Sequence, residues 1–149
     1  ILVLGIRGPS LTSMKSPILI DLKKGGDILK KVYISHPFKN NPKKNMRSVY
    51  SICRHIALNM PHILPVSPLN MFSFLNDSNK YERRKALGYC LRVLSLCDEV
   101  WVFGSWKESE GCRMEVKEAR KLGKAVRFFS GIEDFGSGCG YAASVDSDG

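Results

Sequence analysis

The sequence has little of the features that mark metal-binding or disulfide-rich proteins. Its five cysteines, an odd number, include no C-x-x-C pair, so it shows neither the spacing of a zinc site nor a disulfide framework. Its three histidines, His36, His55 and His62, are scattered along the chain. We therefore expect no metal and no cofactor. Unpaired cysteines also favour a reducing compartment, so the expected location is the cytoplasm.

Long hydrophobic runs, internal repeats and low-complexity stretches are also missing. The most apolar stretch, residues 1–20, is interrupted by glycine, proline, arginine and lysine, and it lacks the basic-then-apolar order of a signal peptide. We therefore expect no membrane insertion. The chain has 149 residues, of which 44% are hydrophobic, and this is enough for one domain with its own core.

Acidic residues are few compared with basic ones. The chain has 14 Asp and Glu against 23 Lys and Arg, a net charge of +9, and residues 1–47 carry ten of the basic side chains beside Asp21 and Asp27. Such a balance is compatible with nucleic acid or with a phosphorylated small molecule. No stretch interleaves basic and aromatic residues as single-strand binders do. The sequence therefore favours a small ligand, and nucleic-acid binding through residues 1–47 is kept as the alternative.

The hydrophobic pattern predicts alternating strands and helices. Runs of β-branched and aromatic residues predict strands at 31–35, 62–66, 99–103 and 125–129. Apolar residues at helical spacing predict helices at 45–60, 80–97 and 111–122. The expected domain division is an N-terminal extension at 1–29, an α/β domain at 30–130 and a flexible C-terminal tail at 131–149.

This order of elements predicts an α/β fold of three layers, flavodoxin- or Rossmann-like, with a parallel sheet of four to five strands and helices on both faces. Right-handed crossovers place all the carboxyl ends of the strands at one edge, where ligands bind in such folds. The expected site loops are therefore 35–45, 66–80 and 104–111. The loop 66–80 also has a length that is typical of binding loops and lids.

Glu115 is the candidate for chemistry. On a helical wheel it falls between Ala119 and Leu122, on the buried side of the helix 111–122. Burial opposes the charge of a carboxylate, whereas a place one turn from the helix start favours it, so the two effects on its pKa oppose each other. The alternative is a glutamate that pairs with an arginine or reaches out to solvent.

Small and hydroxyl residues surround this candidate in the predicted fold. Ser109 lies just before the helix, where free backbone N–H groups form either an anion site or an ordinary capped loop. Tyr33, Ser35, His36 and Phe38 surround the end of the first strand. His36 either orients a ligand and titrates near neutral pH or is plain surface.

The motifs of the chain resemble those of the nucleoside 2-deoxyribosyltransferase-like superfamily. They are, in order, Tyr33-Ile-Ser-His-Pro-Phe38, Cys97-Asp-Glu-Val-Trp-Val-Phe-Gly104, Ser109-Glu-Gly-Cys-Arg-Met-Glu115 and Gly123-Lys-Ala-Val126. The resemblance covers about residues 31–129 and is closest to the DUF4406-like branch of bacterial and phage proteins.

The resemblance implies cleavage or transfer of the (deoxy)ribosyl group of a nucleoside or nucleotide. In the transferases the glutamate that matches Glu115 is the nucleophile, and a second base or water then takes the sugar. The resemblance also implies a small-molecule partner, no cofactor and a homo-oligomer. The implied ligand-binding residues are Tyr33, Ser35, His36, Pro37, Phe38, Gly104, Ser109 and Gly111.

Three departures from the family pattern surround the candidate nucleophile. His36 replaces a glycine, Cys112 replaces a threonine, and Cys90 takes the place of an aspartate in related enzymes. The resemblance therefore leaves the acid that protonates the leaving base unassigned. The alternative to an enzyme is a catalytically silent nucleotide-binding regulatory module of phage or bacterial origin.

Overall fold

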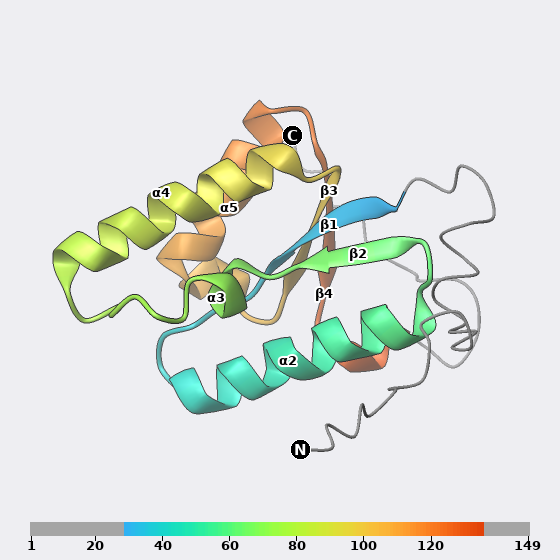
Figure 1. The fold of residues 1–149 in the computed structure, drawn as a ribbon, viewed down its shortest axis with the longest axis horizontal. Helices are drawn as coiled ribbons and strands as arrows, with labels where there is room; N and C mark the ends of the chain where they lie inside the picture. The colour runs from blue at the N-terminus through green and yellow to red at the C-terminus, as the bar shows by residue number, and fades with distance from the viewer. Residues whose placement is uncertain (1–28, 136–149) are drawn as a thin grey trace, which may run out of the picture.

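The computed structural model describes residues 29–135, which form a parallel sheet between two layers of helices (Figure 1). The sheet has the strand order β2-β1-β3-β4, and every neighbouring pair is parallel. The strands are β1 (Lys30–Ser35), β2 (Ile63–Val66), β3 (Glu99–Phe103) and β4 (Ala125–Phe129). The predicted fold class is confirmed, and so is each predicted strand, to within one residue.

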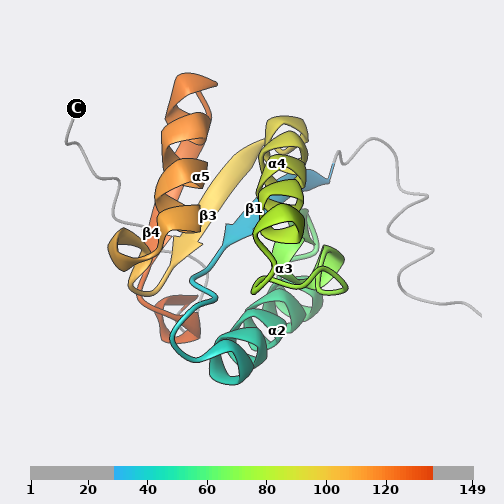
Figure 2. The same cartoon turned by 90° about the vertical axis from the view of Figure 1, so that its left-hand side faces the viewer.

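Helices cover both faces of the sheet. They are α2 (Pro42–Asn59), α3 (Pro68–Met71), α4 (Lys80–Leu96) and α5 (Glu110–Lys121), with the 3₁₀ turns η1 (Trp106–Glu108) and η2 (Ile132–Phe135). Figure 2 shows α2 and η2 on one side of the sheet and α4 and α5 on the other. None of the helices in residues 29–135 combines the length and the apolar character that crossing a membrane requires.

Alternation along the strands divides the core into two clusters, because successive side chains of a strand point to opposite faces. Val32 and Trp101 pack in the cluster under α2 and η2, whereas Tyr33 and Val100 pack in the cluster under α4 and α5. All five residues of β3 are buried. A parallel sheet covered on both faces gives the continuous apolar strand seen here.

Local capping decides where the helices begin. The Asn41 side chain accepts a hydrogen bond from the Lys44 backbone N–H, and Pro42 suits the first turn, so α2 begins three residues before the predicted 45–60. Asn79 caps α4 at the predicted start. Gly123, at φ +67°, ends α5 as predicted, because glycine adopts the left-handed backbone without strain.

Two short elements lie in segments predicted to be irregular. The predicted loop 66–80 contains α3, which begins at Pro68. Residues 132–135, expected in the tail, form η2, and Phe135 packs with 8% exposure against Trp101 and Phe129. The folded unit therefore extends to residue 135. The rest of the predicted tail and residues 1–28 of the predicted extension 1–29 lie outside the described residues.

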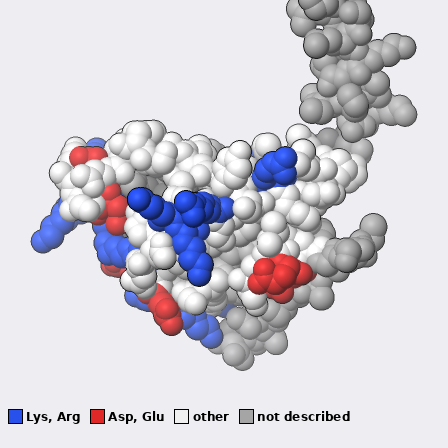
Figure 3. All heavy atoms as spheres, turned by 90° about the horizontal axis from the view of Figure 1, so that it is seen from below, with Lys and Arg blue, Asp and Glu red and all other residues white. Residues whose placement is uncertain are grey.

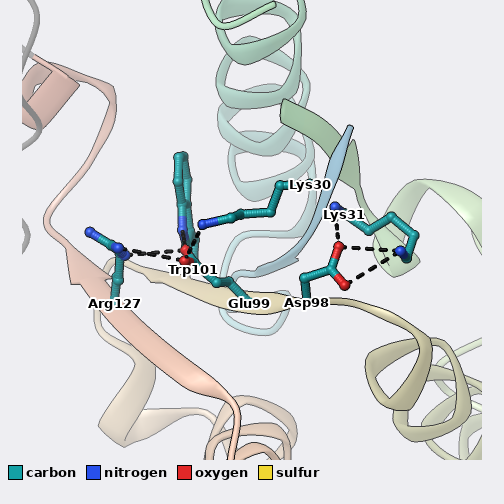
Figure 4. Close-up of polar contacts among 6 residues, drawn as sticks. All are labelled: Lys30, Lys31, Asp98, Glu99, Trp101 and Arg127. Atoms are coloured by element: carbon teal, nitrogen blue, oxygen red, sulfur yellow. Dashed lines mark hydrogen bonds and ion pairs between the residues drawn. The ribbon is translucent and has the colours of Figure 1, made fainter. Parts of the chain in front are cut away.

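At the amino-terminal edge of the sheet, one buried carboxylate gathers three donors (Figure 4). Glu99 accepts hydrogen bonds from Lys30 Nζ at 2.7 Å, Trp101 Nε1 at 3.0 Å and Arg127 Nε at 3.2 Å. Burial pushes the pKa of Glu99 upward, but the donors and the Arg127 charge outweigh it, so the pKa lies below its usual value. The charge of Glu99 at this edge of the sheet is therefore paired with those of Lys30 and Arg127.

A second contact at this edge aligns β3 with β1. The Lys31 backbone N–H donates to Asp98 Oδ2 at 2.7 Å, and the Asp98 N–H donates to the Lys31 carbonyl at 2.7 Å (Figure 4). Asp98 therefore shapes the entry to the strand.

Candidate functional site

The site lies at the point where the strand order reverses. After β1 the chain crosses to β2 on one side, and after β2 it crosses back over β1 to β3 on the other. The connections that leave β1 and β3 therefore diverge, and such divergence opens a crevice at the carboxyl ends of the two strands. Ser35, the last residue of β1, pairs in register with Val102 of β3 at this crevice.

Two hydroxyls of β1 hold the carboxylate of Glu115. Tyr33 Oη donates to Glu115 Oε1 at 2.6 Å, and Ser35 Oγ donates to Oε2 at 2.6 Å. The hydroxyls come from alternate residues of one strand and therefore point to the same face, where α5 brings the carboxylate. In the described part of the chain, no lysine or arginine forms an ion pair with Glu115.

Opposing effects set the pKa of Glu115, but the effect that lowers it comes from hydrogen bonds and not from the helix start that the sequence suggested. Burial raises the pKa of the carboxyl, the bonds from Ser35 and Tyr33 lower it, and burial prevails. The pKa of Tyr33 is raised well above its usual value, by burial first and by the nearby Glu115 charge second. Tyr33 therefore stays a neutral donor, and the carboxylate is oriented by groups that leave its negative charge uncompensated.

Two thiols flank this carboxylate without sharing its chemistry. Burial and the Glu115 charge raise the pKa of Cys90 to about 12 and that of Cys112 to about 11. Both are free cysteines. At neutral pH they stay protonated, so neither is a strong nucleophile or an effective acid.

A cavity of about 100 Å³ opens onto Glu115. It adjoins a polar cavity of about 570 Å³, with which it shares His36, Lys39, Ser109 and Glu110. On the other side it adjoins an apolar cavity of about 200 Å³, whose lining includes Phe38, Met46, Leu69 and Phe72. The carboxylate therefore lies between a polar compartment and an apolar one.

The polar cavity is lined by residues at the start of α2 and before α5. Lys39, Lys44 and Arg113 contribute positive charge, and Glu108 and Glu110 offset part of it. Lysine and arginine side chains also form a patch on the α2 face of the molecule, among scattered acidic residues (Figure 3). These cations suit an anionic group, while neutral serine and asparagine side chains in the same lining suit sugar hydroxyls.

His36 lies between the polar cavity and the Glu115 cavity. Its Nδ1 lies 2.8 Å from the Pro37 carbonyl oxygen and its Nε2 lies 3.0 Å from Ser48 Oγ. Burial lowers the pKa of the imidazole, although the bond to Pro37 opposes the shift. His36 is therefore neutral near pH 7 and fixed in orientation by both ring nitrogens.

The structure brings every residue of the predicted site to this one edge. Tyr33 and Ser35 contact Glu115 directly. Of the other predicted site residues, four line the Glu115 cavity: His36, Phe38, Ser109 and Gly111. Pro37 and Gly104 line the polar cavity. Gly104 has φ +64°, a backbone conformation that glycine tolerates best, at the turn out of β3.

The sequence predicted a site loop at 66–80, but it singled out neither Asp77 within that loop nor the contribution of Arg83 and Leu87 from α4. Asp77, Arg83 and Leu87 line the Glu115 cavity together with Cys90. Arg83 Nη2 donates to Glu110 Oε2 at 2.7 Å, and Arg83 Nε lies 3.9 Å from Asp77 Oδ1. The sequence feature that could have indicated this part of the site is the spacing of residues 83, 87 and 90, which places them on one face of a helix.

Comparison with known proteins identifies the family of the chain. Residues 30–129 match the family model described as a domain of unknown function, DUF7768. The chain belongs to the DUF7768 family. This match covers nearly the whole of the predicted α/β domain, whereas the predicted DUF4406-like branch stays a prediction. A search of curated proteins found no match to this DUF7768 chain.

A solved structure shares the fold of this DUF7768 domain. It is the 2-deoxyribosyltransferase of the psychrotolerant bacterium Bacillus psychrosaccharolyticus, which aligns with a TM-score of 0.50 and 19% identity over 66% of this chain and 71% of that chain. At this identity the likeness shows the fold. Among the described residues, no three His, Cys, Asp or Glu side chains are grouped in a way that would hold a metal ion.

Proposed function

We propose that this DUF7768 protein cleaves the N-glycosidic bond of a nucleoside or nucleotide, or transfers its (deoxy)ribosyl group, with Glu115 as the nucleophile. One observation carries the proposal. A carboxylate oriented by two neutral hydroxyls, with no ion pair to a lysine or arginine among the described residues, opens onto a cavity. A structural glutamate at such a depth would be expected to have a cationic partner. The shared fold with a 2-deoxyribosyltransferase supports the same reaction class.

The geometry fits a covalent mechanism. A Glu115 oxygen attacks the anomeric carbon, the bond from that carbon to the base nitrogen breaks, and the electron pair leaves with the base. Water or a second base then attacks the glycosyl ester and frees the carboxylate. The hydroxyls of Tyr33 and Ser35 fix the carboxylate rotamer, so little orientation entropy is lost on reaching the transition state.

The two compartments beside Glu115 suit the two halves of such a substrate. A nucleobase is flat and largely apolar, and the cavity with Phe38 and Phe72 offers it aromatic and aliphatic surface. The sugar hydroxyls, and a 5′-phosphate where one is present, match the polar cavity with Lys39 and Lys44. We expect a homo-oligomer as well, on the resemblance alone.

A second candidate function is nucleotide binding without turnover. The observation that favours it is Cys90, whose thiol, with a pKa of about 12, does not supply the acid of the aspartate that it replaces. In that case the protein would hold a nucleoside or nucleotide in the same cavities as a regulatory module. Calorimetry against a nucleotide panel would show binding while the same samples release no free base.

The test is an assay for free base. Wild-type protein is incubated with deoxynucleosides and their 5′-monophosphates, and the products are separated by chromatography. We expect base release by wild type and by Glu118→Gln, a control on the same helix whose carboxylate pairs with Lys121, and loss of release in Glu115→Ala. Equal release by wild type and Glu115→Ala would contradict the proposal, and no binding of any nucleotide would remove the second candidate as well.

A further inference from the structure

Cleavage of an N-glycosidic bond leaves electron density on the base, so a proton delivered to the base speeds its departure. A well-placed acid contributes about 10²- to 10⁴-fold to such a step. The thiols of Cys90 and Cys112 lie beside Glu115, but their raised pKa values make them poor donors. His36 lies between the polar cavity and the Glu115 cavity, and both of its ring nitrogens are engaged with other groups.

Two other carboxyl groups line the cavity that holds Glu115, those of Asp77 and Glu110. Glu110 faces the polar cavity and is bound to Arg83 at 2.7 Å. Asp77 instead lines both the Glu115 cavity and the apolar cavity, and its nearest oxygen is 3.9 Å from Arg83. Of the two, Asp77 is therefore the one at the junction where the anomeric carbon and an apolar leaving group would meet.

The loop that carries Asp77 is anchored to α4 by hydrogen bonds on both sides of it. The Asn76 backbone N–H donates to Glu82 Oε2 at 2.7 Å, and the Asn79 side chain accepts from the N–H groups of Tyr81 and Glu82 at 2.9 and 3.2 Å. These contacts hold the Asp77 backbone in place relative to α4. The Asp77 side chain itself is 39% exposed, so a ligand in the apolar cavity can reach it.

We propose that Asp77 is the general acid and base-contacting residue of the site, in place of the aspartate that Cys90 replaces; this inference rests on the proposed function. As the bond from the anomeric carbon to the base breaks, the Asp77 carboxylic acid donates its proton to the base nitrogen that receives the electron pair. The resulting Asp77 carboxylate is stabilised by Arg83. When water attacks the glycosyl ester, its proton returns to Asp77 and the Glu115 carboxylate is restored.

Arg83 is a positioning residue in this scheme. It bridges the loop of Asp77 and the first turn of α5, because it contacts both Asp77 and Glu110. Before the acid step its charge is balanced by Glu110, whose Oε2 lies 2.7 Å from Arg83 Nη2. After that step it has a second carboxylate within reach, which lowers the energy of the ionised product.

The experiment compares two leaving groups in wild type, Asp77→Asn and Glu110→Gln. One substrate is the deoxynucleoside that wild type cleaves fastest, and the other is 4-nitrophenyl 2-deoxyriboside, whose leaving group departs without a proton. We expect Asp77→Asn to lower kcat for the nucleoside about 10²- to 10⁴-fold and to change kcat for the nitrophenyl substrate by less than about 3-fold. Asp77→Glu, which keeps the acid, should recover part of the nucleoside activity.

Other outcomes overturn the inference in distinguishable ways. An equal loss of kcat on both substrates in Asp77→Asn would mean that Asp77 has a structural role. A selective loss for the nucleoside in Glu110→Gln, with none in Asp77→Asn, would mean that Glu110 is the acid. If nitrophenol release persists in Glu115→Gln, the proposed nucleophile fails, whatever Asp77 does. If wild type cleaves neither substrate, the proposed function and this inference fail together.

Discussion

Glu99 and Glu115 lie at opposite edges of the same sheet and differ in what surrounds their carboxylates. Glu99 receives Lys30, Arg127 and the Trp101 indole, and its pKa falls below the usual value. Glu115 receives the hydroxyls of Tyr33 and Ser35, and its pKa rises because burial prevails. The first carboxylate is neutralised by its neighbours and the second is only oriented by them.

The difference follows from the topology of a parallel sheet. At the amino-terminal edge Glu99 pairs in register with Val32 of β1, and Lys30, two residues earlier on the same face, forms an ion pair with Glu99 that closes the edge. At the carboxyl edge the connections leave to opposite sides, so cavities remain beside Glu115. Comparing the two edges teaches that a buried carboxylate points to chemistry when its partners are neutral hydroxyls and an open space adjoins it.

The largest expected effect separates the two glutamates by activity. Glu115→Gln should lower the rate of base release at least about 10³-fold, because amides are far weaker nucleophiles than carboxylates. Glu99→Gln should keep kcat within about 3-fold for the folded protein, since Glu99 lies at the far edge. Steady-state kinetics on both variants checks this, and comparable losses in the two would remove the distinction between the edges.

The next effect tests whether the hydroxyls orient Glu115. Tyr33→Phe deletes the donor to Oε1 while keeping the buried ring, and should lower kcat about 10- to 100-fold with little change in KM. Ser35→Ala should act in the same direction on Oε2. An unchanged kcat in the double variant would mean that the carboxylate needs no support from β1.

A third prediction concerns stability at the closed edge. Glu99→Gln should lower the free energy of unfolding by about 1 to 3 kcal/mol, because Lys30 and Arg127 lose a charged acceptor. Urea denaturation at neutral pH measures this, with Glu115→Gln as the matched variant of the same substitution at the other edge. A larger loss for Glu115→Gln than for Glu99→Gln would reverse the comparison.

The smallest expected effect is the pH dependence of stability, which has opposite signs at the two sites. The raised pKa of Glu115 means that the folded state holds this proton more tightly than the unfolded state, so its contribution is lost as pH rises above the ordinary value of 4.5. The lowered pKa of Glu99 gives a contribution present above 4.5 and lost as pH falls.

Unfolding curves at several pH values from about 3 to 8 make this visible. Relative to wild type, Glu115→Gln should gain stability as the pH rises, and Glu99→Gln should lose it. Parallel trends in the two variants would mean that the two carboxylates feel the same environment.

Much of this architecture could be predicted from local sequence. The strands were found because β-branched and aromatic runs such as that of β3 end at clear breakers such as Gly104. The inward direction of Glu115 followed from the period of α5. The early start of α2 was missed although Asn41 followed by Pro42 is a local helix-start signal, and η2 was missed because Phe135 is held by contacts distant in sequence.

The part of the site formed by Asp77 and Arg83 could not be predicted either, because it too depends on contacts distant in sequence. Asp77 and Arg83 belong to a loop and a helix that reach Glu110 only after the sheet has assembled. On the sequence alone, Arg83 is one of several basic residues outside the apolar stripe of α4. Its pairing with Glu110, 27 residues later, depends on the packing of α4 beside α5.

Trapping the covalent intermediate tests the central claim most directly. A 2-deoxy-2-fluoro nucleoside slows the breakdown of a glycosyl ester, because the electron-withdrawing fluorine destabilises the positively charged transition state. Mass spectrometry of the treated protein should show one added fluorosugar, and peptide mapping should place it on Glu115. Release of base without any adduct, or an adduct on another residue, would contradict the account.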